Sequence, residues 1–528
     1  MISLFFCSVL ASGLTFRGII MKKSFVKTLA FGLVSTLILS ACGAETSSSS
    51  EASSSSQTKE TEASSEVVSS ASVYEYTNPT ELQETYDIVI VGAGGAGMAA
   101  ALSAKDAGMN PVIFEKAPVA GGNTMKSSGG MNASETKFQE ELGIEDSNEL
   151  FFEDTLTGGK GTNNQELLHY LVDNSASAID WLDSMGITLN NISYSGGASV
   201  KRIHRPADGS SVGTYLVDGL IRNITEQSIP LFVNSEVTKI NETDGKVSGV
   251  EIIIEGETKT ITSDAVVVTT GGYGSNHEMI ESFRPDLKGY VSTTAASSTG
   301  DGIKMIEQLG GATVDMDQIQ VHPTVVQDSG MLISETVRGE GAILVNQQGE
   351  RFVNELETRD NVSAAETALP EQYAYLIFDN ELAKCAKQVE YYESEGATIK
   401  ADTIEELAQQ IDIDPATLKA TLDTWNNNVK EQKDPEFGRE TAMDYDLTTG
   451  PFYAIKIAPG IHHTMGGVQI NVDTQVLKED GSVIPGLYAA GEVTGGIHGQ
   501  NRIGGNAVAD IMVFGRQAGV QAAKYANN

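Results

Sequence analysis

Residues 86–97, Tyr-Asp-Ile-Val-Ile-Val-Gly-Ala-Gly-Gly-Ala-Gly, decide the fold of this chain. The Ile- and Val-rich half predicts a buried strand, and the glycines that follow have the spacing Gly-x-Gly-x-x-Gly. An alanine-rich stretch, 98–107, predicts a helix that ends at Gly108, and residues 111–114 predict the next strand. Glu115 stands at the end of that strand. Strand, glycine turn, helix and terminal acid together predict a Rossmann-like βαβ unit that binds a dinucleotide.

Each glycine of this unit has its own task. Gly92 makes the tight turn, Gly94 lets the backbone approach a pyrophosphate, and Gly97 allows the helix to pack on the strand. The N-terminus of the helix faces the phosphates, and Glu115 is expected to bind a ribose hydroxyl. On this evidence alone the dinucleotide is FAD or NAD.

A second loop of small residues, 121–130, follows the acid and would bring backbone along the rest of an extended dinucleotide. Residues 231–240 and 264–270 predict further strands. The chain contains no second Gly-x-Gly-x-x-Gly unit with a terminal acid. We therefore predict no separate NADH site and expect the electron donor to be external.

Glycines, alanines and polar residues alternate in the stretch 462–506 near the C-terminus. Its glycines allow backbone to come close to a flat cofactor. His462 and Arg502 supply groups that can hold an anion against that cofactor. The stretch therefore predicts a redox enzyme that acts on a carboxylate.

Length, charge and cysteine content limit the possible functions. The 528 residues are enough for two or three domains, and the net charge of −36 argues against nucleic acid as a partner. An anionic substrate then needs a local basic pocket. The cysteines are Cys7, Cys42 and Cys385, and no CxxC occurs, so neither an iron–sulfur cluster nor a c-type haem is predicted. We expect Cys385 to be a plain buried thiol, and we predict no metal site.

The N-terminal segment has the pattern of a bacterial lipoprotein signal. A basic run begins at Met21, which we expect to be the true start, and residues 28–39 form an apolar stretch too short to span a bilayer. The following Leu-Ser-Ala-Cys resembles a lipobox, so Cys42 is the predicted lipidation site. We expect a signal peptide over 1–41 and a lipidated, disordered, Ser-rich tether over 42–83. These features predict a lipid anchor in the cell membrane, on its extracytoplasmic face.

Further motifs complete a family resemblance. The chain resembles the flavoprotein of the fumarate reductase/succinate dehydrogenase family, closest to the soluble extracytoplasmic, flavocytochrome c-like fumarate reductases, without their haem domain. Besides the glycine fingerprint, the motifs that carry the resemblance are Thr299-Gly300-Asp301-Gly302, His322-Pro323-Thr324, Ser334-Glu335, Arg338-Gly339, Thr358-Arg359-Asp360, 462–467 and 498–507. The resemblance implies an α/β fold: a Rossmann-like FAD-binding domain over 84–316 and 461–528, with an inserted α+β capping domain over 317–460.

The resemblance also implies a set of FAD contacts. They are Gly92, Gly94, Ala96, Gly97, Glu115, Asn123, Thr124, Ser128, Gly129, Gly130, Val237, Asp301, His463, Glu492, Ala507 and Val508. Membrane-complex members attach FAD covalently through a histidine in the loop after the ribose acid. This chain has Asn123 at the matching place, so we predict non-covalent FAD.

The same resemblance assigns roles for reduction of an alkene by hydride from flavin N5 and a proton from the protein. Arg502 and His462 would bind one carboxylate, with the Gly505 N–H nearby. The second carboxylate would be bound by His322 and Ser334. Arg359 matches the family's proton donor. Glu335, which also borders the substrate, and Arg338 match the relay that returns a proton to Arg359, and their spacing places them on one face of a helical turn.

Several alternatives remain open from the sequence. The same scaffold reduces other unsaturated carboxylates, such as urocanate, acrylate or cinnamate. A ketosteroid dehydrogenase would have no use for the anion-binding pair Arg502 and His462. A flavin lipoprotein that only relays electrons would not need the set Glu335, Arg338 and Arg359. The donor itself, whether a flavin, a quinol or a redox protein, is not readable from the residues.

Overall fold

The computed structural model describes residues 74–528. The predicted signal peptide, Cys42 and most of the predicted tether lie outside the described residues. Within 74–528, no helix is both long and apolar enough to cross a membrane. The tether was predicted to reach residue 83, but the chain is already bound at Thr77: its N–H donates to Leu231 O over 3.0 Å, and its hydroxyl accepts from Leu231 N over 2.9 Å. Ser-rich composition therefore predicted too long a tether.

A largely parallel sheet forms the centre of the first region. Its strands are, from edge to edge, β19 (Gln475–Leu477), β20 (Val483–Ala489), β10 (Ala265–Val268), β1 (Ile88–Val91), β2 (Pro111–Phe114) and β6 (Leu231–Phe232). All neighbours pair in parallel except β19, which is antiparallel to β20. The central strands are buried throughout, as their unbroken Ile and Val runs predict.

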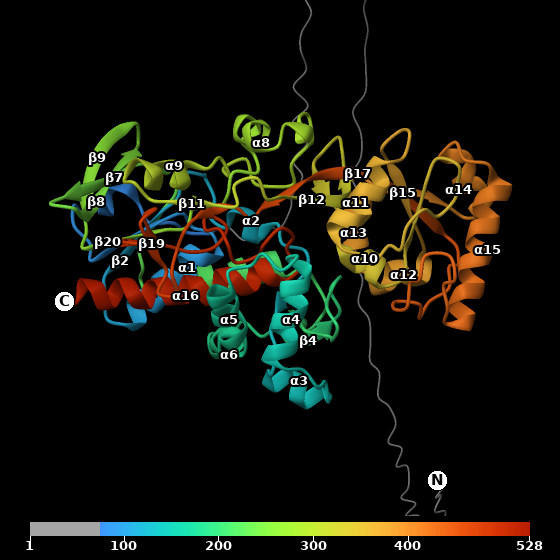
Figure 1. Ribbon diagram of the computed structural model, residues 1–528, viewed down its shortest axis with the longest axis horizontal. Helices are drawn as coiled ribbons and strands as arrows, with labels where there is room; N and C mark the ends of the chain where they lie inside the picture. Colours follow the sequence, from blue (N-terminus) through green and yellow to red (C-terminus); the bar gives the residue numbers. More distant parts are fainter. Residues whose placement is uncertain (1–73) are drawn as a thin grey trace, which may run out of the picture. The chain divides into compact units, whose positions relative to one another are not determined.

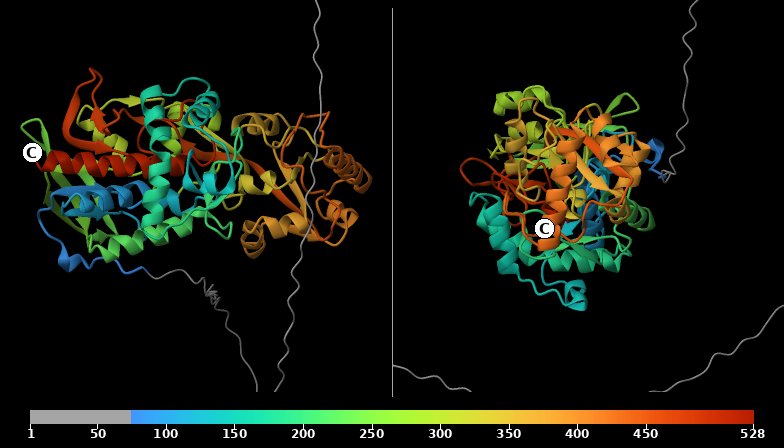
Figure 2. Two further views of the ribbon diagram at one scale, coloured as in Figure 1. Left: turned by 90° about the horizontal axis from the view of Figure 1, so that it is seen from below. Right: turned by 90° about the vertical axis from the view of Figure 1, so that its right-hand side faces the viewer.

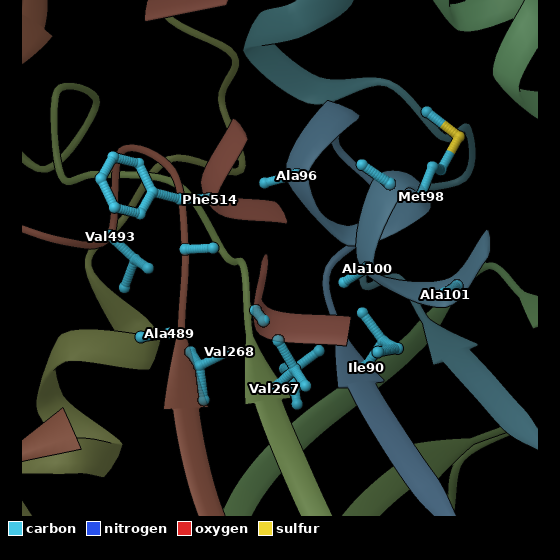
Figure 3. Packing of buried hydrophobic residues seen from close by; sticks show 14 of the residues in the cluster. Ile90, Ala96, Met98, Ala100, Ala101, Val267, Val268, Ala489, Val493 and Phe514 are labelled. Atoms are coloured by element: carbon cyan, nitrogen blue, oxygen red, sulfur yellow. The ribbon is translucent and has the colours of Figure 1, made fainter. Parts of the chain in front are cut away.

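Two alanine-rich helices cover one face of this sheet. The helices α1 (Gly95–Asp106) and α16 (Asn506–Ala526) lie side by side, α16 in red and α1 in blue in the left view of Figure 2. Figure 3 shows Ala96 and Ala100 of α1 and Phe514 of α16 packed with Ile90 and Val267 of the strands. Small side chains let the helices pack closely and bring the N-termini of both towards the sheet's carboxyl edge.

The predicted βαβ unit is present with small changes in its bounds. The strands β1 and β2 pair in register from Ile88 with Pro111 to Val91 with Phe114. Residues 231–240, predicted as one strand, form two: Asn234 adopts φ +50°, which turns the chain out of the first sheet after β6. The second piece opens a separate antiparallel sheet of β7 (Ser235–Thr243), β8 (Lys246–Ile254) and β9 (Glu257–Thr262).

A second sheet and a second core belong to the yellow and orange elements of Figure 1. Its strands are β13 (Met331–Leu332), β12 (Ile319–Val326), β17 (Phe452–Thr464), β15 (Ala374–Asp379) and β14 (Ile343–Val345), with β16 (Ile399–Ala401) also on β17. Its helices are α10 (Glu335–Gly339), α11 (Arg359–Thr367), α12 (Asn380–Cys385), α13 (Gln388–Ser394), α14 (Ile404–Gln410) and α15 (Pro415–Glu431). The core runs in sequence from Ile333 to Ile457 and includes the fully buried Trp425.

The strands β12 and β17 connect the two cores. Ile319 and Ile461 pack in the first core, whereas Ile457 packs in the second. The predicted capping segment 317–460 contains the whole second core; its exact bounds stay a prediction. Cys385 was expected to be buried, but it is the last residue of α12 and is exposed.

The remaining elements are short and surround the sheets. The helices are α2 (Gly122–Met125), α3 (Lys137–Leu142), α4 (Asn148–Gly158), α5 (Gln165–Asp173), α6 (Ser175–Ser184), α7 (Val212–Glu226), α8 (His277–Phe283) and α9 (Asp301–Gln308), with 3₁₀ turns at Pro79–Glu81 and Pro285–Leu287. The small strands are β3 (Met131–Asn132), β4 (Asn191–Ser193), β5 (Ile203–Arg205), β11 (Thr313–Val314) and β18 (Gly467–Val468).

Candidate active site

One cavity of about 720 Å³ extends from the glycine fingerprint to the second region. It is lined at one end by Gly92 and Glu115 and at the other by Glu335 and Arg359. The sequence-predicted cofactor residues other than Gly97 line it, as do the predicted substrate residues His322, Ser334, Glu335, His462, Arg502 and Gly505. The fold thus brings together residues that are almost 420 positions apart in the chain.

The fingerprint end suits a pyrophosphate. A Cβ at Gly94 would have only Thr124 Oγ1 within 4 Å, at 3.9 Å, so the backbone there is open to the cavity. A Cβ at Gly97 would lie 2.0 Å from Gly92 O, so this glycine packs against the turn at Gly92 and does not line the cavity. The N-cap residue Gly94 has no side chain to cap α1, and Gly95 N donates to Thr124 Oγ1 over 3.0 Å, which leaves the other N–H groups of the first turn for an anion.

Glu115 is held at the end of β2 by backbone. Its Oε2 accepts from Ala93 N over 2.9 Å and its Oε1 from Ala117 N over 2.8 Å. Carboxylate oxygens have further lone pairs, so Glu115 can still accept from ribose hydroxyls at the cavity wall. Asp301, on α9, is paired with Lys116. Burial raises its pKa, but the hydrogen bonds from Lys116 and Thr299 outweigh burial and leave it below the usual range.

The middle of the cavity contains a network around Glu492. This buried carboxyl accepts from Asn123 Nδ2 over 2.8 Å and from Thr464 N over 3.1 Å. Burial raises the pKa of Glu492, and those hydrogen bonds oppose the rise only in part. Asn123 also accepts from Ala295 N over 2.6 Å. The Asn123 side chain is therefore fixed by two partners at the wall of the cavity.

Arg359 and Glu335 form the strongest ion pair at the far end. Arg359 begins α11 and donates from Nε to Glu335 Oε1 over 2.7 Å and from Nη2 to Glu335 Oε2 over 3.1 Å. Glu335 begins α10, and Arg338, one turn later, lies 3.7 Å from it. The predicted trio is thus contiguous, in the order Arg359, Glu335, Arg338. Burial raises the pKa of Glu335, but the charges and hydrogen bonds of the arginines lower it to about 2.

Gln320 was missed by the sequence-based prediction. It lies on β12, two residues before His322, and its side-chain oxygen accepts from Arg359 Nη1 over 2.8 Å and from Arg502 Nη2 over 3.0 Å. Its amide nitrogen donates to Asn501 Oδ1 and to Arg502 O, each over 2.8 Å. One neutral side chain therefore sets the spacing of two guanidinium groups. The strand period of two places Gln320 on the face of His322, which is the only sequence signal for it.

Gly504 was missed as well. We predicted a backbone contact from Gly505, which caps α16 with φ +90°. The glycine that touches the ion pair is its neighbour: a Cβ at Gly504 would lie 2.5 Å from Glu335 Oε2 and 3.2 Å from Arg359 Nη2. The pair Arg359 and Glu335 thus requires a glycine at 504.

Three histidines stand around the same end, and all are held neutral. The rings of His322 and His462 lie 5.2 Å apart, edge to face. Burial, reinforced by the positive charge of Arg359, lowers the pKa of both well below the ordinary value. Burial and Arg502 do the same to the pKa of His463. Neutral imidazoles can each donate one hydrogen bond to a carboxylate.

Among these three histidines, Nε2 of His322 and Nε2 of His463 are buried without a hydrogen-bond partner in the described part of the chain. His462 Nδ1 pairs with Thr293 Oγ1 over 2.8 Å. His322 Nε2 is buried and finds no partner among residues 74–528. Ser334, predicted as its companion, caps α10: its Oγ accepts from Thr336 N over 3.3 Å and donates to Thr336 Oγ1 over 3.1 Å. The serine must redirect its hydroxyl before it can bind a ligand.

The charges at this end do not balance. Arg338, Arg359 and Arg502 lie at this end, and within the described residues Glu335 is the only carboxylate in ion-pair contact with any of them. Glu492 and Asp510 act on Arg502 only from beyond ion-pair distance. Burial, with Arg359 next to it, lowers the pKa of Arg502. Arg502 Nε has no partner within the described part of the chain. A buried surplus of positive charge is costly unless an anion completes it.

Comparison with known proteins agrees with this geometry. The profile of a family described as "FAD binding domain" matches residues 87–508. A curated protein of Shewanella frigidimarina, "Probable fumarate reductase Ifc3", is 47% identical over 446 residues, which cover 84% of this chain and 76% of that protein. The chain belongs to the fumarate reductase family of FAD-binding flavoproteins.

Members of this family show how the chain relates to longer proteins. The "NADH:fumarate oxidoreductase" of Klebsiella pneumoniae is 52% identical over 444 residues, 84% of this chain, and this chain spans about half (48%) of that protein. A solved structure described as the open conformation of a flavocytochrome c3 fumarate reductase has a TM-score of 0.73 and 46% identity, and the match covers 85% of this chain and 80% of that one. FAD is accordingly the cofactor of the cavity, and it supplies a hydride when reduced.

Proposed function

We propose that this chain reduces an unsaturated dicarboxylate, fumarate, to the saturated acid. The observation that carries the proposal is the excess of guanidinium groups over ion-paired carboxylates at one end of the cavity, where Arg338, Arg359 and Arg502 have only Glu335 in ion-pair contact among the described residues. Two substrate carboxylates would offset this excess. Global charge cannot attract this substrate, because the chain carries −36 overall. The names of the relatives in Klebsiella and Shewanella support the same substrate.

The substrate's carboxylates would be bound at two points. Arg502 and His462 hold one carboxylate, since Arg502 Nε is unpaired within the described residues and Gln320 fixes the guanidinium. His322 Nε2 and the Ser334 hydroxyl hold the other. The first point is fixed before the substrate arrives, so it needs little ordering on binding, whereas the Ser334 hydroxyl must first turn away from Thr336.

Arg359 would then donate the proton. Addition of hydride to one alkene carbon leaves carbanion character at the other, stabilised by the adjacent carboxylate. Arginine is protonated at rest, and a carbanion is a far stronger base. Glu335, ionised and in bidentate contact with Arg359, is placed to return the proton, with Arg338 behind it.

The test is a reductase assay with a reduced dye as donor. Oxidation of the dye should depend on fumarate, and crotonate, urocanate and cinnamate should react far more slowly because each lacks the second carboxylate. Equal or higher rates with a monocarboxylate would overturn the dicarboxylate assignment. Dye oxidation independent of any alkene would instead indicate a flavin protein that only relays electrons.

Location and donor are further parts of the proposal. We propose that Cys42 is lipidated and anchors the protein at the extracytoplasmic face, where an external flavin, quinol or redox protein reduces it. Replacement of Cys42 by Ala should release the protein from the membrane fraction. We also propose that FAD is non-covalent, because Asn123 replaces the attachment histidine; acid precipitation should leave all of the flavin in the supernatant.

A further inference from the structure

Glu366 is a buried carboxyl group that the mechanism above does not use. It lies on α11, seven residues after Arg359, so it points from the same face of the helix two turns further along. Its side chain is 0% exposed. Neither carboxylate oxygen makes a hydrogen bond of ordinary geometry to any residue in 74–528. Buried polar groups in this condition are rare and usually have a functional explanation.

The charged group that acts on Glu366 is Arg338 of α10, although the two side chains do not form an ion pair. The two charges interact: Glu366 raises the pKa of Arg338, and Arg338 lowers that of Glu366. Arg338 is 2% exposed and uses only Nη1 in a hydrogen bond, 2.6 Å to Glu355 O. Its Nε and Nη2 have no hydrogen-bond partner among the described residues, and Nη2 lies 3.7 Å from Glu335. Arg338 therefore has free donors available between Glu335 and Glu366.

Glu366 is also suited to hold a proton. Burial raises its pKa well above the ordinary value, and Arg338 and the Ala374 N–H of β15 oppose the rise only in part. The carboxyl group is therefore protonated under conditions in which Glu335, with a pKa of about 2, is ionised. In the row Glu366, Arg338, Glu335, Arg359, the one base is thus Glu335, and Glu366 holds a proton in reserve behind Arg338.

We propose that Glu366 is the proton-holding end of the relay. When Arg359 gives its proton to the substrate, Glu335 and then Arg338 each pass one proton on, and Glu366 supplies the replacement to Arg338. Since Glu366 and Arg338 are not in hydrogen-bond contact, the transfer runs through a bridging water molecule. One proton leaves the Glu366 O–H bond, one is shifted at each link, and one forms the new C–H bond. The Glu366 carboxylate then takes its replacement from solvent at the C-terminal end of α11, where Ala368 is exposed. This inference rests on the proposed reductase function.

Glu366→Gln is the sharpest variant, because glutamine keeps the size and the neutral charge of the protonated acid but cannot pass its proton on. We expect kcat for fumarate to fall by about tenfold or more. KM should not change, because Glu366 does not line the cavity. The solvent deuterium isotope effect on kcat should increase, since reprotonation becomes the slow step. Glu366→Asp, which retains a carboxyl group, should keep much more activity than Glu366→Gln.

Glu371→Gln is the matched control, because Glu371 is an exposed carboxylate five residues later. It should behave as the wild type. Wild-type kcat and isotope effect in Glu366→Gln would overturn the proposal. So would equal losses in the Gln and Asp variants together with a lower thermal unfolding midpoint, which would assign Glu366 a structural role.

The wild type separates this inference from the proposed function. If it reduces another alkene but not fumarate, the dicarboxylate assignment fails, and the same variants tested on that alkene still decide the role of Glu366. If it reduces no alkene, both proposals are overturned.

Discussion

Two clusters of buried arginine lie in this protein, and they are built in opposite ways. The first, here called the cap cluster, contains Arg351, Arg439, Glu355 and Asp434. Arg351 donates two hydrogen bonds to Glu355, of 2.8 and 2.9 Å, and one of 3.0 Å to Asp434. Arg439 donates to Glu355 over 3.0 Å, and both guanidinium groups lie 4.7 Å from the ring centroid of Trp425. Two positive charges meet two negative ones.

The second, here called the site cluster, contains Arg338, Arg359, Arg502 and Glu335. Three positive charges meet one negative charge, and several N–H donors of Arg338 and Arg502 have no partner among residues 74–528. The cap cluster is electrically complete without a ligand, whereas the site cluster needs about two negative charges. The difference separates arginine used for structure from arginine held ready for an anion.

The largest effect is expected for Arg359→Ala in the site cluster. The proton donor is lost, so kcat for fumarate should fall by about 10³- to 10⁴-fold. FAD content should stay at the wild-type level, because Arg359 contacts Glu335 and Gln320 and no part of the fingerprint. Steady-state kinetics and flavin stoichiometry measure both. Activity above a tenth of the wild-type value would contradict the role.

Glu355→Gln tests the cap cluster instead. Loss of the charge leaves Arg351 and Arg439 sharing one carboxylate, so the free energy of unfolding should fall by about 3–5 kcal/mol. Denaturant unfolding measures the change, and Glu357→Gln, an exposed neighbour, should leave it unaltered. Unchanged stability in Glu355→Gln would mean that the cap cluster is not a structural device.

The sequence predicted the parts of both regions that local patterns control. The βαβ unit from Ile88 to Glu115 was correct because strand, turn and helix each have a local signal. The strand over 231–240 was wrong because the left-handed turn at Asn234 depends on which sheet each half joins. The predicted C-terminal end of the tether was wrong for the same reason: Thr77 is hydrogen-bonded to Leu231, which is distant in the sequence.

From the sequence, the site residues could be predicted only where the side chain is itself ionisable or charged and stands in a recognisable motif. Arginine, histidine and glutamate in family motifs identified the trio of Arg359, Glu335 and Arg338. Gln320 and Gly504 lack such a signal, since their importance comes from the guanidinium groups that the fold places against them. Glu366 looks like a solvated helix residue until the packing of α11 is known.

A medium effect is expected for Arg502→Gln. The variant keeps a donor but removes one of the three site charges, so kcat/KM for fumarate should fall by about 100-fold, mainly through KM. Arg502→Lys should lose less, since it keeps the charge and loses only the planar fork. Stability of the ligand-free protein should not fall, in contrast to Glu355→Gln, because a surplus charge is removed. Loss of kcat at constant KM would contradict a role in binding.

The smallest effect is expected for pH. It shows whether arginines or histidines supply the positive charge that binds the substrate carboxylates. Burial and nearby arginines hold the pKa of His322 and His462 well below the ordinary value, so both are neutral in the free site from pH 6 to 8. Arg502, whose pKa burial lowers to about 9, stays largely protonated, and Glu335, with its pKa of about 2, stays ionised over the same range. The affinity for succinate, a dicarboxylate that cannot be reduced, should therefore change by less than about twofold. Flavin absorbance titrations at each pH measure the affinity for succinate.

If binding instead required a histidine with an ordinary pKa to be protonated, affinity would fall about tenfold for each pH unit above that pKa. Such a fall would move the positive charge from the arginines to the histidines and remove the contrast between the two clusters.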